Sequence, residues 1–423
     1  MKILWVTAQI LPLVADDMNC KKNGFGGWVM NMLNQLKEEE EIELGVAMVS
    51  SYVSELYVKR VDNIMCFVAP QVGQKGMSEK DRDSIIEMFS PDIIHVEGNE
   101  FSIHNVFAKN KRVPTLVSLQ GILSGYEPYQ YGEIPIVDLM FNVKKHHVID
   151  SWILFLRKQM LFDKRIAIET DTISNADYIM GRTFWDRAHS YWINPRAKYF
   201  ECNRILRPTF YQEKWLYENT EQHSIFVGNG YSALKGLHFV IEAINLLKEE
   251  YKDIKVYVAG KSPIVDSEKL SLHKFGYSKY IHSLIEKYNL KNNVVFMGEL
   301  LEAEMIYRMK RCNVYVLPSL IENSPNTLGE AMMLGMPCVS AYVGGAPEMA
   351  VDEKECLFYR SNDPKLLAWQ IKRVFDNEEF AKMLGQNAQE HAIKTHDPVV
   401  NKNALLDAYA SIMESAAERN EGI

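Results

Sequence analysis

Two carboxylates eight residues apart, Glu322 and Glu330, flank a predicted helix start in the second half of the chain. A buried strand is expected to end at Leu317, Ser324 is a good N-cap, and Pro325 suits the first helical position. Carboxylates repel phosphate, so the two glutamates would accept hydrogen bonds from hydroxyl groups, such as those of a ribose or a sugar. The spacing therefore predicts a site for a ligand that carries a diol.

The same helix start offers unpaired backbone N–H groups near Asn326, Thr327 and Leu328, which form a natural site for an anion. Gly335 is expected to end the helix. A purely structural interpretation stays open, in which the glutamates only cap the helix or lie on its solvated face. Spacing alone does not separate the two interpretations.

A second loop, residues 226–236, follows the first predicted strand of the second half and opens a helix. Gly228 and Gly230 would let the backbone approach a ligand, and Lys235 would neutralise a phosphate as a point charge. No third glycine follows at the dinucleotide spacing, and no phosphate-binding P-loop occurs in the chain. The alternative is a tight turn with a surface lysine.

Two further glycine loops follow predicted strands. Residues 23–29 hold three glycines, among them Gly26 and Gly27, at the start of a predicted helix in the first half. Residues 343–348 form the other loop, after the strand that ends at Ser340. Each loop has a plain structural alternative as a surface turn, but four such loops together favour a ligand site.

Short apolar runs alternate with amphipathic segments along most of the chain, which predicts parallel sheets covered by helices. About a dozen strands are many for one sheet, so we expect two sheets of six or seven strands. A linker is predicted within residues 205–217. The predicted strands cover residues 3–7, 44–49, 65–68, 93–96, 115–118, 178–180, 198–201, 224–227, 255–259, 294–297, 314–317, 338–340 and 356–359.

Composition excludes several classes of protein. The 423 residues are 47% hydrophobic and 24% charged, which is ordinary for a globular chain, and the net charge of −8 disfavours general nucleic-acid binding. No apolar run is long enough to span a membrane, and Lys2 to Ala8 is interpreted as a buried strand instead of a signal peptide. The six scattered cysteines favour free thiols in a reducing, cytoplasmic compartment.

Together these motifs resemble the family 4 glycosyltransferases of the GT-B type. The E-x7-E segment is the specific part, and the resemblance extends over nearly the whole chain. The stretches that carry it are Phe25-Gly-Gly-Trp28, Pro91-Asp-Ile-Ile-His95, Val117-Ser-Leu-Gln-Gly121, Lys235-Gly-Leu237, Val258-Ala-Gly260, Val295-Phe-Met-Gly298, Glu322 to Glu330 and Gly344-Gly-Ala-Pro-Glu348.

The resemblance implies two Rossmann-like, doubly wound α/β domains that face a cleft. Residues 1–207 would form the acceptor-side domain, with a C-terminal helix at about 403–423 packing back on it. Residues 208–402 would form the domain that binds the nucleotide sugar.

The resemblance also implies roles for single residues. Glu330 would bind the ribose, Glu322 would contact the donor sugar, and Lys235 would stabilise the departing diphosphate. Gly27, with its neighbour Gly26, would let the other domain close on the diphosphate. The loop beyond Gly298 would contact the base. The remaining donor-binding residues would be Gly228, Gly230, Ser324, Asn326, Thr327 and Leu328.

Two departures from the family pattern stand out. The family usually has an arginine shortly after the glycine that opens the Lys235 loop, whereas residues 229–231 are Asn, Gly and Tyr. Arg182 and Arg204 are candidates to supply that charge. The family also often has a histidine where Gln120 stands; glutamine can orient a hydroxyl but cannot act as a base at neutral pH.

The predicted reaction moves a hexose from a nucleoside-diphosphate sugar, most often UDP-linked, to a hydroxyl of a glycan, a glycolipid or a small molecule. The resemblance implies retention of configuration and a place in bacterial polysaccharide or cell-envelope synthesis. No metal or cofactor is expected. For a double displacement, Glu97 and Glu348 are weak candidates as nucleophile. The alternative from another class is a non-catalytic homologue that binds a nucleotide sugar or a partner enzyme. A GT-B-like epimerase or phosphorylase is a weaker one.

Two polar segments are open to a functional and a structural interpretation. Residues 144–165 combine six basic residues with large apolar ones, which fits either contact with an anionic membrane surface or a helix packed on the sheet. Asp81-Arg82-Asp83 imitates a metal-binding D-x-D motif, but carboxylates at a helix start are expected there for structural reasons. His146 and His147 are interpreted as solvated surface.

Overall fold

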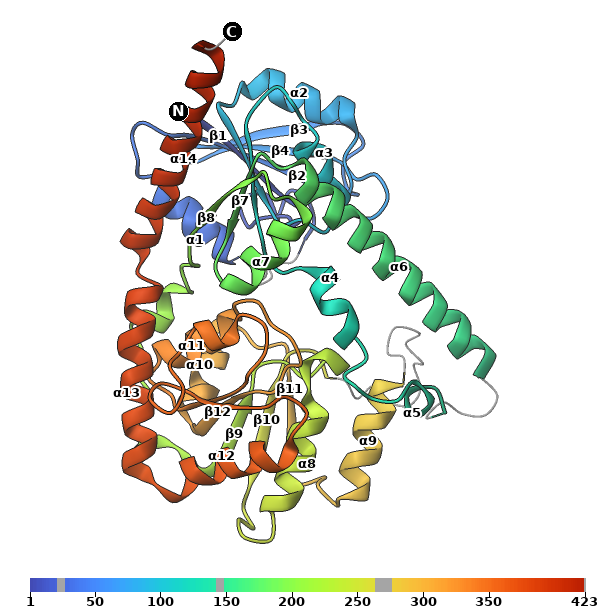
Figure 1. Ribbon diagram of the computed structural model, residues 1–423, viewed down its shortest axis with the longest axis vertical. Helices are drawn as coiled ribbons and strands as arrows, with labels where there is room; N and C mark the ends of the chain where they lie inside the picture. Colours follow the sequence, from blue (N-terminus) through green and yellow to red (C-terminus); the bar gives the residue numbers. More distant parts are fainter. Residues whose placement is uncertain (21–26, 142–147, 263–275, 422–423) are drawn as a thin grey trace. The chain divides into compact units, whose positions relative to one another are not determined.

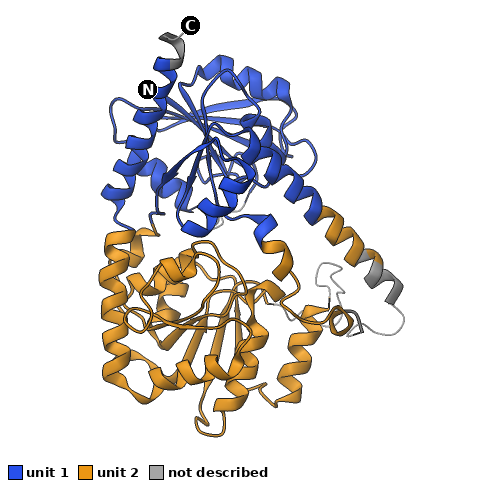
Figure 2. Cartoon of the chain, in the orientation of Figure 1, with its two compact units in different colours: residues 1–125, 162–205, 396–423 blue, residues 126–161, 206–395 orange. Residues whose placement is uncertain are grey.

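The computed structural model describes residues 1–20, 27–141, 148–262 and 276–421. The chain forms two compact units (Figure 2). Unit 1 holds residues 1–125, 162–205 and 396–423, and unit 2 holds residues 126–161 and 206–395. Each unit is built around its own sheet and its own apolar core.

Unit 1 contains an eight-stranded sheet in the order β3-β4-β2-β1-β5-β6-β7-β8 (Figure 1). All neighbours pair in parallel except β3 and β4. The inner strands are almost continuously buried, as expected for a sheet covered on both faces. The strands are β1 Lys2–Thr7, β2 Glu43–Ser50, β3 Tyr57–Val61, β4 Ile64–Pro70, β5 Ile93–Glu97, β6 Thr115–Ser118, β7 Tyr178–Gly181 and β8 Lys198–Glu201.

The next helices come from the first half of the chain and from its C-terminal segment, and most of them belong to unit 1. Tyr409 of the last helix donates to or accepts from Nδ1 of His95 at 2.6 Å, so the end of the chain packs on β5. The helices are α1 Gly27–Leu36, α2 Glu79–Phe89, α3 Ser102–Ala108, α4 Leu123–Tyr126, α5 Ile136–Phe141, α6 Val148–Asn175, α7 Phe184–Ile193 and α14 Pro398–Glu421. Of these, α5 lies in unit 2, and α6 is divided between the units at residues 161 and 162.

Unit 2 contains a six-stranded parallel sheet in the order β11-β10-β9-β12-β13-β14. In chain order this is 3-2-1-4-5-6, the arrangement of a doubly wound nucleotide-binding sheet. Its switch point lies between β9 and β12, where loops from the two strands leave in opposite directions. The strands are β9 Glu221–Val227, β10 Lys255–Ala259, β11 Val294–Gly298, β12 Cys312–Leu317, β13 Cys338–Ala341 and β14 Leu357–Tyr359.

The helices of unit 2 cover both faces of this sheet. Helix α8 is almost wholly buried and packs against α12, and α11 packs against α13 (Figure 1). The α-helices are α8 Leu237–Leu247, α9 Tyr277–Lys287, α10 Glu302–Lys310, α11 Asn326–Met333, α12 Pro364–Asp376 and α13 Glu378–Thr395. Short 3₁₀ turns include residues 208–211, 233–235 and 346–348.

The observed sheets differ from the prediction in one strand. All thirteen predicted runs are strands, but the first sheet has eight strands because β3 was not predicted. β3 is an exposed edge strand that carries Lys59 and Arg60, and charge on an edge hides the apolar pattern of a strand.

The units also divide the chain differently from the predicted ranges 1–207 and 208–402. Residues 126–161 group with unit 2, because Ile134 and Leu139 belong to its apolar core. The Nε2 of His238 is 3.0 Å from the carbonyl oxygen of Gly132, which ties the segment to α8. Residues 396–402 group with unit 1, together with the rest of α14.

No helix in the described ranges combines the length and apolarity needed to cross a membrane. All six cysteines are free thiols, and five of them are buried.

Candidate functional site

Three loops of unit 2 meet at the carboxyl ends of β9 and β12. The N–H of Leu320 donates to the carbonyl oxygen of Leu234 at 2.9 Å, which joins the loop after β12 to the loop after β9. A Cβ on Gly228 would lie 3.3 Å from Cβ of Thr327, so the first loop also touches the start of α11. This is the edge where doubly wound sheets bind ligands.

Lys235 and Glu322 are brought together at this edge although 87 residues separate them. Nζ of Lys235 lies 2.5 Å from Oε1 of Glu322, and the hydroxyl of Ser319 donates to the same oxygen at 2.7 Å. Ser319 and Glu322 are buried, whereas the Lys235 side chain keeps 28% of its surface exposed. Glu322 therefore fixes the position of the Lys235 ammonium, while part of the Lys235 side chain stays accessible to a ligand.

Helix α11 begins one residue later than predicted. Its N-cap is Pro325, with extended backbone angles, and the cap has no side-chain hydrogen bond. Ser324 is therefore not the cap, and its hydroxyl lies 3.7 Å from Sδ of Met349. The predicted cap is wrong by one residue, because proline is compatible both with the N-cap and with the first helical position.

The first backbone amides of α11 form the expected donor group. The N–H of Leu328 donates to the carbonyl oxygen of Pro325 at 3.0 Å. For the N–H groups of Asn326 and Thr327, no acceptor is found within the described part of the chain. These two amides, with the partly exposed side chain of Lys235, can receive an anion.

The third loop, which follows β13, fixes the backbone of Glu322. The N–H of Gly345 donates to the carbonyl oxygen of Glu322 at 3.0 Å. Gly344 has φ +53°, and a Cβ there would lie 1.9 Å from the same oxygen. Only glycine permits both this backbone angle and this close approach.

A cavity of about 380 Å³ opens beside this loop. Its size falls in the range of small-molecule sites. Its walls include Ile321 and Gly344, which neighbour Glu322, and the exposed ring of Tyr342.

Glu330 lies in α11 and is only 3% exposed. Arg207 binds it with two parallel hydrogen bonds, from Nε to Oε1 and from Nη2 to Oε2, both 2.7 Å long. Burial raises the pKa of the Glu330 carboxyl, and the Arg207 guanidinium opposes that shift. Glu330 is therefore not a solvated face residue, and its carboxylate has a fixed orientation.

The remaining predicted glycines of unit 2 lie in the loops around this edge. Gly298 ends β11 with φ +77°, and a Cβ there would meet open space. Gly230 is packed, because a Cβ would lie 2.7 Å from side-chain carbons of both Leu237 and Val258. Within residues 229–231, where the family pattern has an arginine, Gly230 is thus closely surrounded by apolar side chains, whereas Asn229 and Tyr231 are exposed.

Gln120 and Gly27 lie in unit 1, at the carboxyl edge of its sheet. Nε2 of Gln120 donates to the carbonyl oxygen of Glu97 at 3.5 Å, and Gly27 begins α1. Gly26, Lys144, Lys145 and the two histidines 146 and 147 lie outside the described residues.

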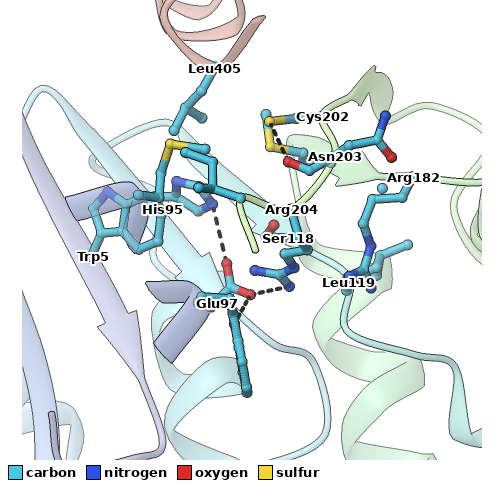
Figure 3. A pocket seen from close by; sticks show the side chains of 15 residues that line it. Trp5, His95, Glu97, Ser118, Leu119, Arg182, Cys202, Asn203, Arg204 and Leu405 are labelled. Carbon is cyan, nitrogen blue, oxygen red and sulfur yellow. Dashed lines mark hydrogen bonds and ion pairs between the residues drawn. The ribbon is translucent and has the colours of Figure 1, made fainter. Parts of the chain in front are cut away.

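A charged cluster fills the same edge of unit 1 (Figure 3). The Glu97 carboxylate is 1% exposed, forms an ion pair with Arg204 and accepts a 3.2 Å hydrogen bond from the indole N–H of Trp28. His95 points toward the second carboxylate oxygen, with 3.9 Å between Nε2 and Oε2. The cavity of about 20 Å³ beside these residues has room for one water molecule.

The candidate arginines of unit 1 are held by groups of that unit. Nη2 of Arg182 donates to the carbonyl oxygens of Leu119 and Gln120 at 3.1 and 3.0 Å. Arg204 is paired with Glu97. A buried carboxylate that is paired with an arginine is a poor nucleophile, so the geometry disfavours Glu97 in a double displacement.

The D-x-D segment has a structural explanation. Asp81 lies in the first turn of α2, and its carboxylate accepts a 2.6 Å hydrogen bond from the N-cap residue Ser78. Asp83 pairs with Arg82. No cluster of three or more metal-ligating side chains occurs in the described ranges.

Sequence reasoning missed two residues of the unit 2 site. They are Ser319, in the loop after β12, and Arg207, in the predicted linker. Neither carries a local signal, because their roles depend on contacts that the fold creates.

A protein-family model matches part of the chain. Residues 209–391, less than half of the chain, match the model of the family described as Glycosyl transferases group 1. The match lies wholly within unit 2 and contains every residue of the Lys235, Glu322 and Glu330 cluster except Arg207.

Solved structures match over almost the whole length. Sucrose-phosphate synthase from Thermosynechococcus elongatus aligns with a TM-score of 0.73 and 14% identity, covering 98% of this chain and 99% of that one. HepE from Anabaena, solved in complex with UDP-glucose, aligns with a TM-score of 0.68 and 15% identity, covering 97% and 100%. The chain has the GT-B fold.

Curated relatives match over shorter stretches. WcaL of Escherichia coli K12, a glycosyltransferase named for colanic acid biosynthesis, is 27% identical over 184 residues, which is 41% of this chain and 42% of WcaL. The uncharacterized glycosyltransferase MJ1178 of Methanocaldococcus jannaschii is 24% identical over 318 residues, 70% of this chain and 82% of that protein.

Proposed function

We propose that this GT-B protein is a glycosyltransferase that moves a hexose from a nucleoside-diphosphate sugar to an acceptor hydroxyl. The observation that carries the proposal is the cluster at the carboxyl edge of the unit 2 sheet. There the exposed side of Lys235 and the amides of Asn326 and Thr327 can bind a diphosphate. The buried carboxylates Glu322 and Glu330 can accept hydrogen bonds from sugar and ribose hydroxyls.

The proposed chemistry needs charge stabilisation more than a nucleophile. The bond between the anomeric carbon and the diphosphate oxygen breaks, and a bond to the acceptor oxygen forms. Lys235 and the α11 amides stabilise the negative charge on the departing diphosphate. The acceptor proton passes to an oxygen of that diphosphate, on the same face of the sugar, so the configuration is retained. This route does not need Glu97 as a nucleophile, and it is the retaining mechanism that the family 4 resemblance implies.

Within the donor, we assign the sugar to the region of Glu322 and the adjacent cavity of about 380 Å³. UDP is the proposed nucleotide, supported by the UDP-glucose complex of the structurally similar HepE. Polysaccharide synthesis is the proposed pathway class, supported by the name of the relative WcaL. Metal independence is part of the proposal, because Lys235 and the amides supply the positive charge.

A lipid-linked or membrane-near acceptor is proposed from one face of α6. Ile153, Leu156, Met160 and Leu161 are 47%, 55%, 70% and 56% exposed, and the basic side chains of Arg157 and Lys164 are exposed on the same helix. An apolar strip with basic neighbours suits the surface of an anionic membrane.

The experiment is a thermal-shift series with UDP, GDP, ADP and their sugars, in EDTA. A nucleotide at about 100 times its dissociation constant stabilises the fold by about 2.7 kcal/mol if it binds only the folded state. Lys235→Ala should weaken binding of that nucleotide by about tenfold to a hundredfold, since a contact between charged groups is lost.

Lys310→Ala is the matched control. Nζ of Lys310 also lies 2.5 Å from a glutamate oxygen, that of Glu213, but at the end of α10 that precedes β12. Lys310→Ala should therefore leave nucleotide binding unchanged. Absence of any shift with wild type contradicts the proposal. A second outcome is that the protein binds a nucleotide sugar but releases no nucleotide with any acceptor in a panel of hydroxyl compounds. That outcome would favour the non-catalytic alternative, which the missing arginine at residues 229–231 also supports.

A further inference from the structure

A cavity of about 520 Å³ opens in unit 1 at the amino end of its sheet. Tyr178 and Lys198 line it, and they are the first residues of the neighbouring parallel strands β7 and β8. Gln120 follows the carboxyl end of β6, which is parallel to β7. The cavity therefore lies at the opposite end of the sheet from Gln120 and from the charged cluster around Glu97.

The walls of this cavity are positively charged, although the chain as a whole carries −8. Three cations line it, from Lys111, Arg196 and Lys198, against the single carboxylate of Asp177. One oxygen of that carboxylate, Oδ2, already accepts the N–H of Thr115 at 3.2 Å. The cavity is thus a basic site in an acidic chain, which favours an anionic ligand.

Uncharged groups hold the two lysines. Nζ of Lys111 donates to the carbonyl oxygen of Asn175 at 3.1 Å, and Nζ of Lys198 donates to the hydroxyl of Ser411 at 2.7 Å. Arg196 is exposed. Within the described ranges, no carboxylate forms an ion pair with any of these three cations.

Basic residues nearby in the sequence are paired instead. Lys109 forms an ion pair with Asp171, and Arg112 forms one with Glu87. The cations of the cavity therefore differ from their neighbours in keeping their charge available to a ligand.

Asn194 fixes the turn that carries Arg196. It is only 6% exposed. Its Nδ2 donates to the carbonyl oxygens of Ile173 and Ala176 at 2.8 and 3.0 Å, and its Oδ1 accepts the N–H of Arg196 at 3.3 Å. These bonds, like the one from Lys111, occupy carbonyl groups at the end of α6, whose partial negative charge would otherwise oppose an anion.

The size and the remaining groups of the cavity indicate the class of ligand. Its volume lies in the range of small-molecule sites and leaves room for more than a phosphate group. Tyr178 is the one aromatic side chain among the described residues that line it, and it is only 3% exposed, so an apolar group would find little surface to contact. Ser174, Asn175 and Ser415 offer hydroxyl and amide groups, which are partners for sugar hydroxyls.

We infer that this cavity is a binding site for a phosphorylated monosaccharide, separate from the proposed donor site of unit 2. The phosphate accepts hydrogen bonds from Arg196 and Lys198, and the sugar hydroxyls face Ser174 and Ser415. Lys198 already contacts Ser411, and both serines 411 and 415 belong to α14. A bound ligand therefore links β8 to α14 and stabilises the end of the chain on unit 1.

Calorimetric titration with glucose 6-phosphate tests the inference. Removing one cation, as in Arg196→Gln or Lys198→Gln, should weaken binding about threefold to tenfold, because each contact joins charged groups but is partly exposed to water. The double variant should weaken binding by at least about tenfold. Binding by wild type should also weaken as the NaCl concentration is raised, and unphosphorylated glucose should not bind measurably.

Arg60→Gln is the matched control. It removes the same charge from β3, the edge strand at the other end of the strand order of the same sheet. It should leave the affinity for glucose 6-phosphate unchanged. Two variants act at α14: Ser415→Glu adds a carboxylate to the wall and should abolish binding, whereas Ser415→Ala should largely preserve it.

Hydrogen exchange gives a readout at the linked helix. Saturating glucose 6-phosphate should raise the protection of α14 peptides in wild type but not in the double variant of Arg196 and Lys198. If the double variant does not fold, Ser415→Glu gives the same comparison.

A wild-type protein that does not bind glucose 6-phosphate, or a folded double variant with wild-type affinity, overturns the inference. Displacement of glucose 6-phosphate by UDP overturns it as well, because the ligand would then occupy the donor site. Sedimentation with phosphatidylglycerol vesicles through Arg196 and Lys198, without binding of glucose 6-phosphate, would assign the cavity to a lipid headgroup and overturn it too. The proposed function depends on unit 2 and stands apart from all three outcomes.

Discussion

Replacing Arg204 with methionine should destabilise unit 1 strongly, because it leaves the Glu97 carboxylate buried without its counter-ion. Glu97 is 1% exposed and the Arg204 side chain 12%, so water screens the pair very little. Breaking such a pair from one side costs about 3–5 kcal/mol. For a domain of about 150–250 residues that corresponds to about 6–20 °C in Tm. The remaining hydrogen bond from Trp28 favours the lower part of this range.

The assay is thermal unfolding combined with hydrogen exchange, since a chain with two units need not unfold in one step. Peptides from β5 and β6 should lose protection in Arg204→Met, and peptides from the unit 2 sheet should not. Adding Glu97→Gln should recover part of the loss, because no charge is then buried alone. A Tm within about 2 °C of wild type, or no recovery in the double variant, would refute the reasoning.

The pH dependence of thermal stability tests the Glu97–Arg204 pair independently. Burial raises the pKa of Glu97, but Arg204, together with His95 and Arg182, outweighs burial, so the folded-state pKa is lowered. The stability from this group is therefore present above the unfolded pKa of about 4.3 and is lost as pH falls through the folded value. Without Arg204, burial is opposed only by His95 and Arg182, so the pKa of Glu97 should rise. The difference in Tm between wild type and Arg204→Met should shrink from about pH 7.5 to about pH 5. A constant difference contradicts this assignment.

Two further predictions concern the glycine loop and the exposed helix face. Gly344→Ala should weaken UDP binding and lower Tm more than Gly298→Ala, since both have positive φ but only the first places a Cβ against the Glu322 oxygen. Equal effects would show that backbone strain alone matters. Leu156→Glu with Met160→Glu should abolish sedimentation with anionic vesicles and spare nucleotide binding, whereas Met88→Glu, on the exposed part of α2, should do neither. Equal sedimentation of wild type with neutral and anionic vesicles would rule out the proposed membrane contact.

The sequence by itself determined the elements and the edge of the sheet that carries the site. Strand runs, helix periodicity and glycine positions are local signals, which is why thirteen strands and the α11 segment were predicted within a few residues. Local patterns also placed Lys235, Glu322 and Glu330 in loops that follow strands or in helices that open there. The parallel topology then placed these residues at one edge.

Only the tertiary structure decided which side chains meet. Lys235 and Glu322 are 87 positions apart, Arg207 and Glu330 are 123 apart, and a contact between His95 and α14 spans 314. Such pairs leave no periodic trace, because each depends on strand order and on the packing of distant segments. The same holds for residues 126–161, whose apolar side chains could cover either sheet and which the fold assigns to unit 2.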